Sequence, residues 1–396
     1  MRYIVLLSAA AAAAMAGGYK IPESSINGTA LSAAYVAASH GADSAYYNPA
    51  AMVYNEDANL FEADMTYIGL SLIDFDGTSD YSSKKENFLV PTFHFASKKL
   101  GDNGARVGLS VIVPAGLSKR WAHSTPKATA EEFTLQTVEV NPSFAVPLSD
   151  TVSFGAGFRI IHTSGIVKAQ GTVPFNYSQS MTGDSIDVGY NFAINYRPEP
   201  NISLAATYRS KIDLTVEGDA DLTSPFVNGN REVSVTVPVP AALNLAAAYS
   251  FGQGTTIEAV FERTFWSSYK QLNFNYTDAT AEVVFGTSKA RNWEDTNSYR
   301  LGLTQQYNQW TAMAGVAYDE TPVPESTLGY ELPDSDAWIF SLGGKYKMDE
   351  HWSFGLAGLL DLKKSRDVYQ TPATGIKGEF SNARAYLVTA GIEYRF

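Results

Sequence analysis

The sequence has no cysteine, few basic residues and, after its first apolar segment, no long apolar run. Without cysteine the chain can form neither disulfides nor thiolate metal sites. Its formal net charge is −12, from 29 Lys and Arg against 41 Asp and Glu, which argues against nucleic-acid binding. Because a transmembrane helix needs about 18 consecutive apolar residues, the chain beyond residue 16 is either water-soluble or crosses a membrane as β-strands.

Recognisable catalytic motifs are also missing. The sequence shows no G-x-S-x-G, no phosphate-binding loop and no G-x-G-x-x-G after a predicted strand. Its five histidines are scattered and form no i, i+4 pair: His40, His94, His123, His162 and His351. We therefore expect a protein that is not an enzyme and that needs no metal or other cofactor.

Aromatic residues and glycine are plentiful. The chain has 23 Tyr, 21 Phe, 6 Trp and 31 Gly at a mean hydropathy of −0.13. Many aromatics at modest hydropathy are typical of a membrane β-barrel with an apolar outer face and a polar lumen. Residues 1–16 read as a signal peptide, with Arg2, an apolar run from Ile4 to Ala14 and a small-residue cleavage site, so we expect an exported protein whose mature chain starts at Gly17.

Short turns and long polar stretches alternate from residue 58 onward. The short turns recur about every 50 residues, as two long strands and one long loop require. Seven long loops predict fourteen strands, and short turns on one side with long loops on the other are typical of outer-membrane barrels. The predicted strands are 58–74, 87–98, 104–115, 131–147, 151–170, 183–197, 201–216, 232–250, 254–268, 290–307, 310–320, 335–348, 351–363 and 380–396.

The last strand has the clearest alternation. Its even-numbered residues from Tyr386 to Phe396 are apolar with aromatics at both ends, as expected of a lipid-facing strand with two interfacial girdles. An edge strand in a soluble β-sandwich is the alternative interpretation. The length of the strands and the asymmetry of the turns favour an all-β fold, a 14-stranded antiparallel transmembrane barrel.

The segment before the first strand has a different character. Residues 17–56 are rich in Ala, Ser and Gly and lack strand alternation. Asn48 is placed to N-cap a helical turn that begins with Pro49, and Thr29 to Ser39 could form a short helix. We interpret residues 17–56 as a plug of helical turns inside the barrel of residues 57–396; an ordinary N-terminal arm is the alternative.

Several stretches resemble the FadL-type long-chain fatty-acid transporters of Gram-negative outer membranes, a family that includes aromatic-hydrocarbon channels. The plug with Asn48-Pro49-Ala50 resembles the family's N-terminal hatch. Pro114 to Trp121 resembles the end of its third strand, and Asn292 to Leu303 resembles its tenth. The segment from Ala317 to Pro324, followed by Leu332 to Trp338, is the most specific match.

This resemblance implies a mechanism. In the family, a hydrophobic substrate passes from extracellular loops to a pocket inside the barrel, and leaves sideways at a kink in the third strand, where Pro114 and Gly116 lie here. Fatty-acid members place basic residues inside the barrel, and Lys168 and Lys289 lie near such positions. Val113 stands where those members have a serine, a departure that bears on carboxylate specificity.

We therefore expect a monomer in the Gram-negative outer membrane, surrounded by membrane lipid and lipopolysaccharide. Its expected function is passive import of hydrophobic molecules, fatty acids first and aromatic hydrocarbons second. In this hypothesis the plug is a gate, and Asn48, Pro49 and Ala50 set its resting shape. A general porin and a surface adhesin are the alternatives.

Overall fold

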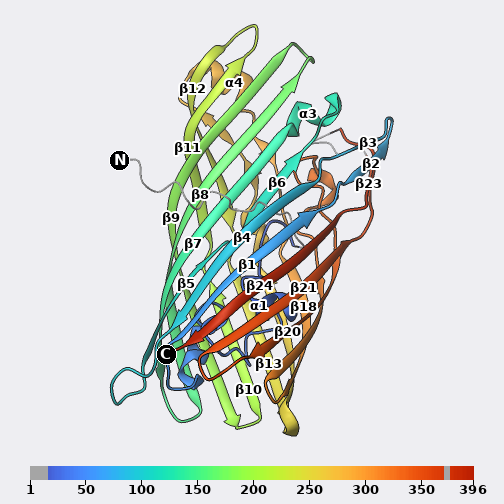
Figure 1. The fold of residues 1–396 in the computed structure, drawn as a ribbon. Coiled ribbons are helices and arrows are strands. Elements are labelled where there is room, and N and C mark those ends of the chain that lie inside the picture. The colour runs from blue at the N-terminus through green and yellow to red at the C-terminus, as the bar shows by residue number, and fades with distance from the viewer. Residues whose placement is uncertain (1–16, 370–374) are drawn as a thin grey trace.

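A closed antiparallel barrel of fourteen strands forms the body of the protein (Figure 1). The computed structural model describes residues 17–369 and 375–396. The strands of the wall are, in order, β1 (Leu60–Leu70), β4 (Glu86–Ala96), β5 (Arg106–Ile112) with β6 (Gly116–Arg120), β7 (Glu132–Pro147), β8 (Val152–Gly171), β9 (Tyr177–Glu199), β10 (Ile202–Arg209) with β11 (Ile212–Thr223), β12 (Asn228–Val239) with β13 (Ala242–Phe251), β14 (Thr255–Thr264), β18 (Thr296–Tyr307), β19 (Trp310–Asp319), β20 (Ala337–Lys347), β21 (Trp352–Lys363) and β24 (Arg384–Arg395).

The first and last strands close the barrel, and their ladder runs from Leu60 opposite Arg395 to Leu70 opposite Ala385. The predicted fold class is confirmed. Three of the predicted strands are not continuous, however, because the third, seventh and eighth each consist of two segments. The predicted signal peptide lies outside the described residues.

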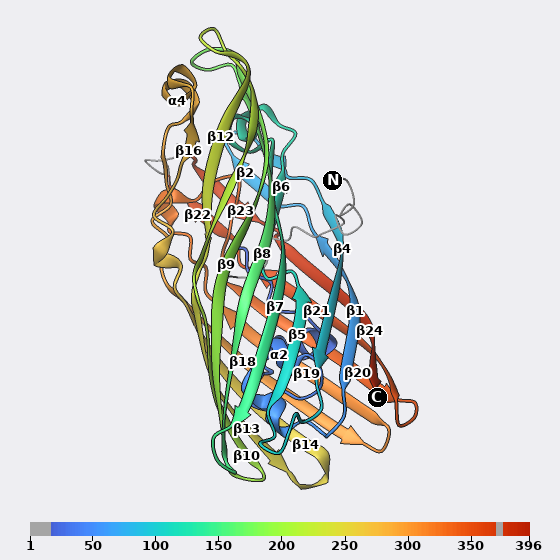
Figure 2. The same cartoon turned by 90° about the vertical axis from the view of Figure 1, so that its left-hand side faces the viewer.

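The long loops carry small elements of their own at one end of the barrel. Strands β2 (Asp74–Gly77), β3 (Tyr81–Ser82), β22 (Arg366–Val368) and β23 (Gly378–Ser381) form a separate sheet there. The short helices α3 (Ser124–Ala130) and α4 (Ala279–Phe285) lie at the same end. The loop after β14 also contains β15 (Gln271–Leu272), which pairs with β17 (Lys289–Ala290), and β16 (Phe274–Tyr276), which pairs with β12 and so extends the barrel sheet. The opposite end consists of short turns (Figure 2).

The outer face in the short-turn half is apolar, as a lipid-facing wall requires. On β24, Tyr386 and Val388 are exposed, whereas Leu387 and Thr389 are buried inside. No helix among the described residues is long and apolar enough to cross a membrane.

The polarity of the wall inverts at the breaks in the seventh and eighth strands. In β10 the exposed side chain Leu204 faces outward and Thr207 faces inward; beyond Ser210, the even-numbered residues of β11, such as Leu214, are the buried ones. The break therefore shifts the strand by one residue and moves its apolar side chains from the outer to the inner face. In β11 the outward side chains include Glu217, so this part of the wall stands in water.

Residues 17–56, the hatch, fold inside the short-turn half of the barrel (Figure 2). They contain α1 (Ile26–Ala30), α2 (Ser44–Tyr47) and the 3-10 helix η1 (Pro49–Tyr54). The predicted helix over Thr29 to Ser39 is wrong. The Ser25 side chain caps α1, and the helix ends because Ser32 and Ala33 adopt positive φ angles of 49° and 58°.

Two wall glycines let the hatch lie directly on the strands. A Cβ at Gly155 would stand 2.4 Å from the nitrogen of Ala50, and one at Gly315 would stand 2.2 Å from the carbonyl carbon of Leu31. Both positions therefore need glycine for close backbone approach. The hatch is thus fitted to the wall.

Candidate functional site

The third strand is broken at Val113–Ala115, between β5 and β6. Within the described ladders, β4 pairs with β5 only from Phe93 to Ala96, and β6 pairs with β7. The rest of β4 therefore pairs with β1 alone, which leaves an interruption in the wall between the second and third strands. Pro114 contributes to the break because it has no N–H to donate to a ladder. Gly116 does not have a positive φ angle, so its backbone conformation here is one that other residues can also adopt.

The first described residues of the hatch occupy this interruption. Ile21 N donates to Pro114 O at 3.0 Å, and Gly116 N donates to Tyr19 O at 2.9 Å. Tyr19–Ile21, the gate segment, therefore pairs with the free edge of the third strand, and Lys20 lies opposite Ala115. Ile21 packs in the same apolar cluster as Val113.

Above the interruption, the end of β6 contacts the first residue of β4 and the segment just before it. Arg120 Nε donates to Glu86 Oε1 at 2.8 Å, and Lys84 N donates to Arg120 O at 2.8 Å. The opening is therefore bounded on the long-loop side by an ion pair and filled from inside by the gate segment.

An apolar cavity, the apolar chamber, lies inside the long-loop half next to the gate segment. It is lined mainly by aliphatic and aromatic side chains: Tyr19, Leu117, Phe133, Leu135, Val237, Tyr269, Arg291, Trp293, Val323, Thr327, Gly329, Glu331 and Leu332. Tyr19 belongs to the gate segment and also lines the apolar chamber. Its hydroxyl donates to Pro238 O at 2.5 Å, and its ring centroid is 4.7 Å from that of Trp266. A ligand in this chamber would touch the gate segment directly.

The polar edge of the apolar chamber is an ion pair between Arg291 and Glu331. Burial alone would raise the pKa of Glu331, but Arg291 and then Lys289 lower it, so the net shift is downward. Burial lowers the pKa of the Lys289 ammonium, which lies 5.8 Å from the centroid of the Phe274 ring. The charges of Arg291 and Glu331 therefore neutralise each other at the edge of an otherwise mainly apolar lining.

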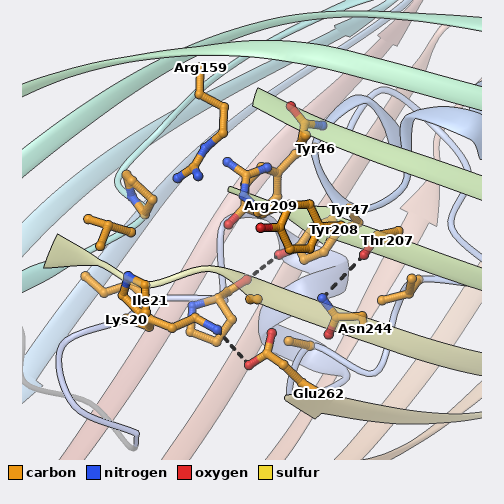
Figure 3. Close-up of a pocket in the computed structure, with 18 of the residues that line it drawn as sticks. Lys20, Ile21, Tyr46, Tyr47, Arg159, Thr207, Tyr208, Arg209, Asn244 and Glu262 are labelled. Carbon is orange, nitrogen blue, oxygen red and sulfur yellow. Dashed lines mark hydrogen bonds and ion pairs between the residues drawn. The ribbon is translucent and has the colours of Figure 1, made fainter. Parts of the chain in front are cut away.

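A second cavity, the polar chamber, lies on the other side of the gate segment. Figure 3 shows Lys20 and Glu262 on one side of it and the arginines Arg159 and Arg209 on the other. Lys20 Nζ is 2.7 Å from Glu262 Oε1, an ion pair that ties the gate segment to β14 across the barrel. Arg159 and Arg209 both bind Glu139, and Arg159 Nη2 is 2.9 Å from its Oε2.

The hatch is held to the wall by buried polar side chains. The Glu258 carboxylate accepts hydrogen bonds from Val36 N and Ala37 N, both at 2.6 Å, and from Ala38 N at 3.1 Å. Ser203 Oγ donates to Ala37 O at 2.6 Å. Sequence reasoning missed these residues because an isolated Glu or Ser in an alternating strand gives no local sign of its partner more than 160 positions away.

The predicted cap at Asn48 is wrong. Asn48 precedes η1, but its side chain makes no capping bond. Instead, Asn48 Nδ2 donates to Val36 O at 2.9 Å. The carbonyl of Val36 is buried and needs a hydrogen-bond donor, and the Asn48 side chain supplies that donor instead of capping the short helix η1. Pro49 is the first residue of η1, and Ala50 O accepts from Ser153 Oγ at 2.8 Å.

The residues proposed for ligand binding are not brought together. Lys168 lies on the opposite face of β8 from the buried Val167, and its ammonium is 2.8 Å from Glu132. Lys289 lies among the long loops in β17, and Val113 lies at the third-strand break. Among the described residues no group of three or more His, Asp or Glu side chains is arranged to hold a metal ion.

Comparison with known proteins identifies the family. Residues 7–396 match the family described as outer membrane protein transport protein (OMPP1/FadL/TodX). The long-chain fatty acid transport protein of Escherichia coli O6:H1 is 24% identical over 97% of this chain and 95% of its own.

Two solved structures share the fold. A Pseudomonas aeruginosa FadL homologue superposes with a TM-score of 0.82 at 21% identity, covering 96% of this chain and 100% of its own. The Pseudomonas putida toluene transporter TodX does so with a TM-score of 0.71 at 17% identity, covering 93% and 98%. With the plugged fourteen-strand barrel, these matches show that the chain is an outer-membrane protein of the OMPP1/FadL/TodX transport family.

Proposed function

We propose that this barrel imports hydrophobic molecules passively, with long-chain fatty acids as the first candidates and aromatic hydrocarbons as the second. The observation that carries the proposal is the apolar chamber in the long-loop half, next to a gate segment that fills a break in the wall. A cavity with an apolar lining and few polar groups suits an apolar ligand. The relatives named above include a fatty acid transport protein and a toluene transporter, which are the two candidate classes.

In the proposed route, the ligand enters from the extracellular loops and binds in the apolar chamber. The hatch blocks the direct path, so the ligand leaves sideways between β4 and β6 once the gate segment moves. That movement breaks two backbone hydrogen bonds to the third-strand break, the Lys20–Glu262 ion pair and the bond from the Tyr19 hydroxyl to Pro238 O. A hydrogen bond of this kind is worth about 0.5–1.5 kcal/mol net. A cost of a few kcal/mol corresponds to a minor open state that a ligand can stabilise.

The hatch is proposed to act as the gate, with Asn48, Pro49 and Ala50 holding its resting shape. Asn48 does so through Val36, whose own N–H binds Glu258, and Ala50 through Ser153 of the wall. No step of this route changes a covalent bond, so the protein is proposed to be a channel and not an enzyme.

Uptake by cells tests the proposal. Cells that lack their own fatty-acid transporter would receive this gene, and uptake of labelled oleate and labelled toluene would be measured beside surface abundance. Uptake of either ligand above the empty-vector control supports the proposal. Normal surface abundance with no uptake of either ligand contradicts it.

Planar bilayers separate the alternatives. A plugged channel should show little steady conductance, whereas a general porin has a continuous aqueous lumen and conducts steadily. Binding of host material without any uptake would indicate an adhesin.

A further inference from the structure

Two acidic side chains of β1, Glu62 and Asp64, face the hatch from the wall. They are alternate residues of the strand, so they share its inner face, where they are 0% and 4% exposed. None of their four carboxylate oxygens has a hydrogen-bond donor among the described residues. A buried charge that is not paired is costly, so two such carboxylates side by side call for an explanation.

The wall leaves both space and an unused hydroxyl around Asp64. Its side chain lies within hydrogen-bonding reach of Glu62. Ionised carboxylates only accept, so two carboxyl groups form a hydrogen bond only when one of them is protonated. Thr92, directly opposite Asp64 on the inner face of β4, is 2% exposed, and its hydroxyl has no partner in the described part of the chain. On the other side, a Cβ at Gly391 would overlap Asp64 Oδ1, so β24 has a glycine where this carboxyl group needs room.

The charges around the pair are mostly negative. The titratable and charged groups that face it are Asp43 and Tyr35 of the hatch, His94 of β4, Lys345 of β20 and Glu393 of β24. Lys345 is already bound to Glu393. Asp43 accepts hydrogen bonds from Ser25 Oγ at 2.7 Å and from Asn27 Nδ2 at 2.9 Å. Four carboxyl groups therefore face a single ammonium group.

His94, opposite Glu62 in the ladder, uses both of its ring nitrogens elsewhere. Nδ1 is 3.0 Å from Ser110 Oγ and Nε2 is 2.8 Å from Ser24 O, partners that a neutral imidazole satisfies. Within the described residues, no third acidic or histidine side chain joins the pair in an arrangement that could hold a metal ion. A proton is therefore the positive charge that fits between Glu62 and Asp64.

We propose that Glu62 and Asp64 share one proton while the hatch is in place, and that the pair gives this proton to water when the hatch moves away. Asp43 is the hatch group whose charge acts on both carboxyl groups. A proton on the pair removes one of the two negative charges that a docked Asp43 would meet. Once water reaches the pair, both carboxyl groups can ionise, because burial no longer disfavours the charged form. The closed hatch thus binds one more proton than the open hatch.

This linkage makes the hatch sensitive to pH. Because the closed state holds the extra proton, acid favours closure, and closure weakens as the pH rises. The shared proton is independent of the proposed function, whereas its effect on transport rests on the hatch being the gate.

Infrared spectroscopy tests the proton directly, because a protonated carboxyl group has a carbonyl band that a carboxylate lacks. Purified protein in detergent at about pH 7 would be compared with Asp64→Asn, whose amide can donate to Glu62 in place of the proton. We expect this variant to lose one band of a protonated carboxyl group, and Glu62→Gln to lose the same band. Asp150→Asn, which changes an exposed aspartate between β7 and β8, is the matched control and should lose none.

The double variant Glu62→Gln/Asp64→Asn distinguishes a shared proton from two separate ones. It should lose one band, as each single variant does. Loss of two bands would mean that each carboxyl group carries its own proton. No loss in any of the three variants would mean that the pair carries none, and either result overturns the proposal.

Planar bilayers test the effect of the proton on the hatch. We expect brief conductance events of the wild type to become at least about fivefold more frequent between about pH 6 and about pH 9, since one coupled proton can shift an equilibrium up to about tenfold per pH unit. Asp64→Asn, whose amide does not titrate, should stay closed at both pH values, and Asp150→Asn should follow the wild type. A wild type without this pH dependence, or an Asp64→Asn variant that keeps it, would overturn the link between the proton and the hatch.

Uptake measurements separate this inference from the proposed function. If the band and the pH dependence both require the pair, but neither oleate nor toluene is taken up, the shared proton stands and the proposed import fails. If uptake is normal, but Asp64→Asn changes neither the band nor the conductance, the shared proton fails and the proposed import stands.

Discussion

The two halves of the barrel interior are built in opposite ways. In the long-loop half the wall turns aliphatic side chains such as Leu214, Val216 and Val235 inward. In the short-turn half it buries polar side chains such as Asn141 and Asn195. The first lining can surround an apolar ligand without stripping water from polar groups, and the second supplies hydrogen-bond partners to the backbone of the hatch.

This difference favours the proposed sideways exit. An apolar ligand that moved on into the short-turn half would displace hatch backbone from its polar partners, and each buried group left unpaired costs about 1–3 kcal/mol. The break in the third strand lies where the two halves meet, and its closure depends on few hydrogen bonds. Movement of the gate segment is therefore the less costly way out, and each experiment below perturbs one half or the boundary between them.

Locking the boundary should have the largest effect. Lys20 and Ala115 are opposite each other in an antiparallel bridge, at a Cα separation of roughly 4.5–5.5 Å that suits a disulfide. Because the chain has no other cysteine, the double variant Lys20→Cys/Ala115→Cys should form one defined cross-link. We expect oxidised cells to lose at least about nine-tenths of their oleate uptake, and a reducing agent to restore it.

The single variant Lys20→Cys controls for loss of the ion pair with Glu262. Full uptake by the cross-linked protein would mean that the gate segment need not leave the third strand.

Placing a polar group in the apolar half should have the next largest effect. Leu135 is 4% exposed and lines the apolar chamber. Leu135→Asn adds an amide without a partner there, at about 1–3 kcal/mol, so we expect uptake to fall by at least about fivefold. Leu135→Met conserves volume and polarity and should retain uptake. Equal uptake in both variants at equal surface abundance would argue against the chamber as part of the route.

Loosening the polar half should have a smaller effect. Glu258→Gln replaces a carboxylate that accepts three backbone hydrogen bonds by an amide with one acceptor oxygen. We expect brief conductance events in planar bilayers as the hatch shifts, with the barrel intact. Glu217→Gln changes an exposed glutamate of β11 and should leave the channel closed. A closed channel in Glu258→Gln as well would show that other contacts hold the hatch.

The smallest effects should come from the turn at Asn48 and Pro49. Asn48→Ala removes one hydrogen bond to Val36, worth about 1 kcal/mol, and Pro49→Ala relaxes the backbone at the start of η1. We expect normal surface abundance and a change in oleate uptake of up to about fivefold. Wild-type uptake in both variants would remove the gating role from this turn.

Sequence reasoning predicted the wall better than the interior. The period-two pattern of β24 and the spacing of turns depend on neighbours along the chain, so the fourteen strands could be found without contacts. The inversion of polarity beyond Ser210 could not be predicted. The strand alternates on both sides of the break, so the sequence does not show that the register shifts by one residue there. The apolar side chains of β11 look the same whether they face lipid or lumen.

The contacts of the site were less predictable still. Asn48 looks like a helix cap when only its neighbours are considered, and the structure uses it for Val36 instead. Glu258 carries no local signal, since what distinguishes it is its partner on the hatch. The family resemblance pointed to the third strand, yet not to Tyr19–Ile21 as the segment that fills its break.

Mapping the exit directly tests the central claim, that the ligand leaves through the wall and not past the hatch. Cells expressing the protein would take up a photoreactive diazirine fatty acid, be irradiated during transport, and yield peptides for mass spectrometry. The account predicts label on residues 86–98 and 107–119, the two edges of the opening. Label concentrated instead on Tyr35, His40 and Tyr54, which line the cavities at the short-turn end, would contradict it.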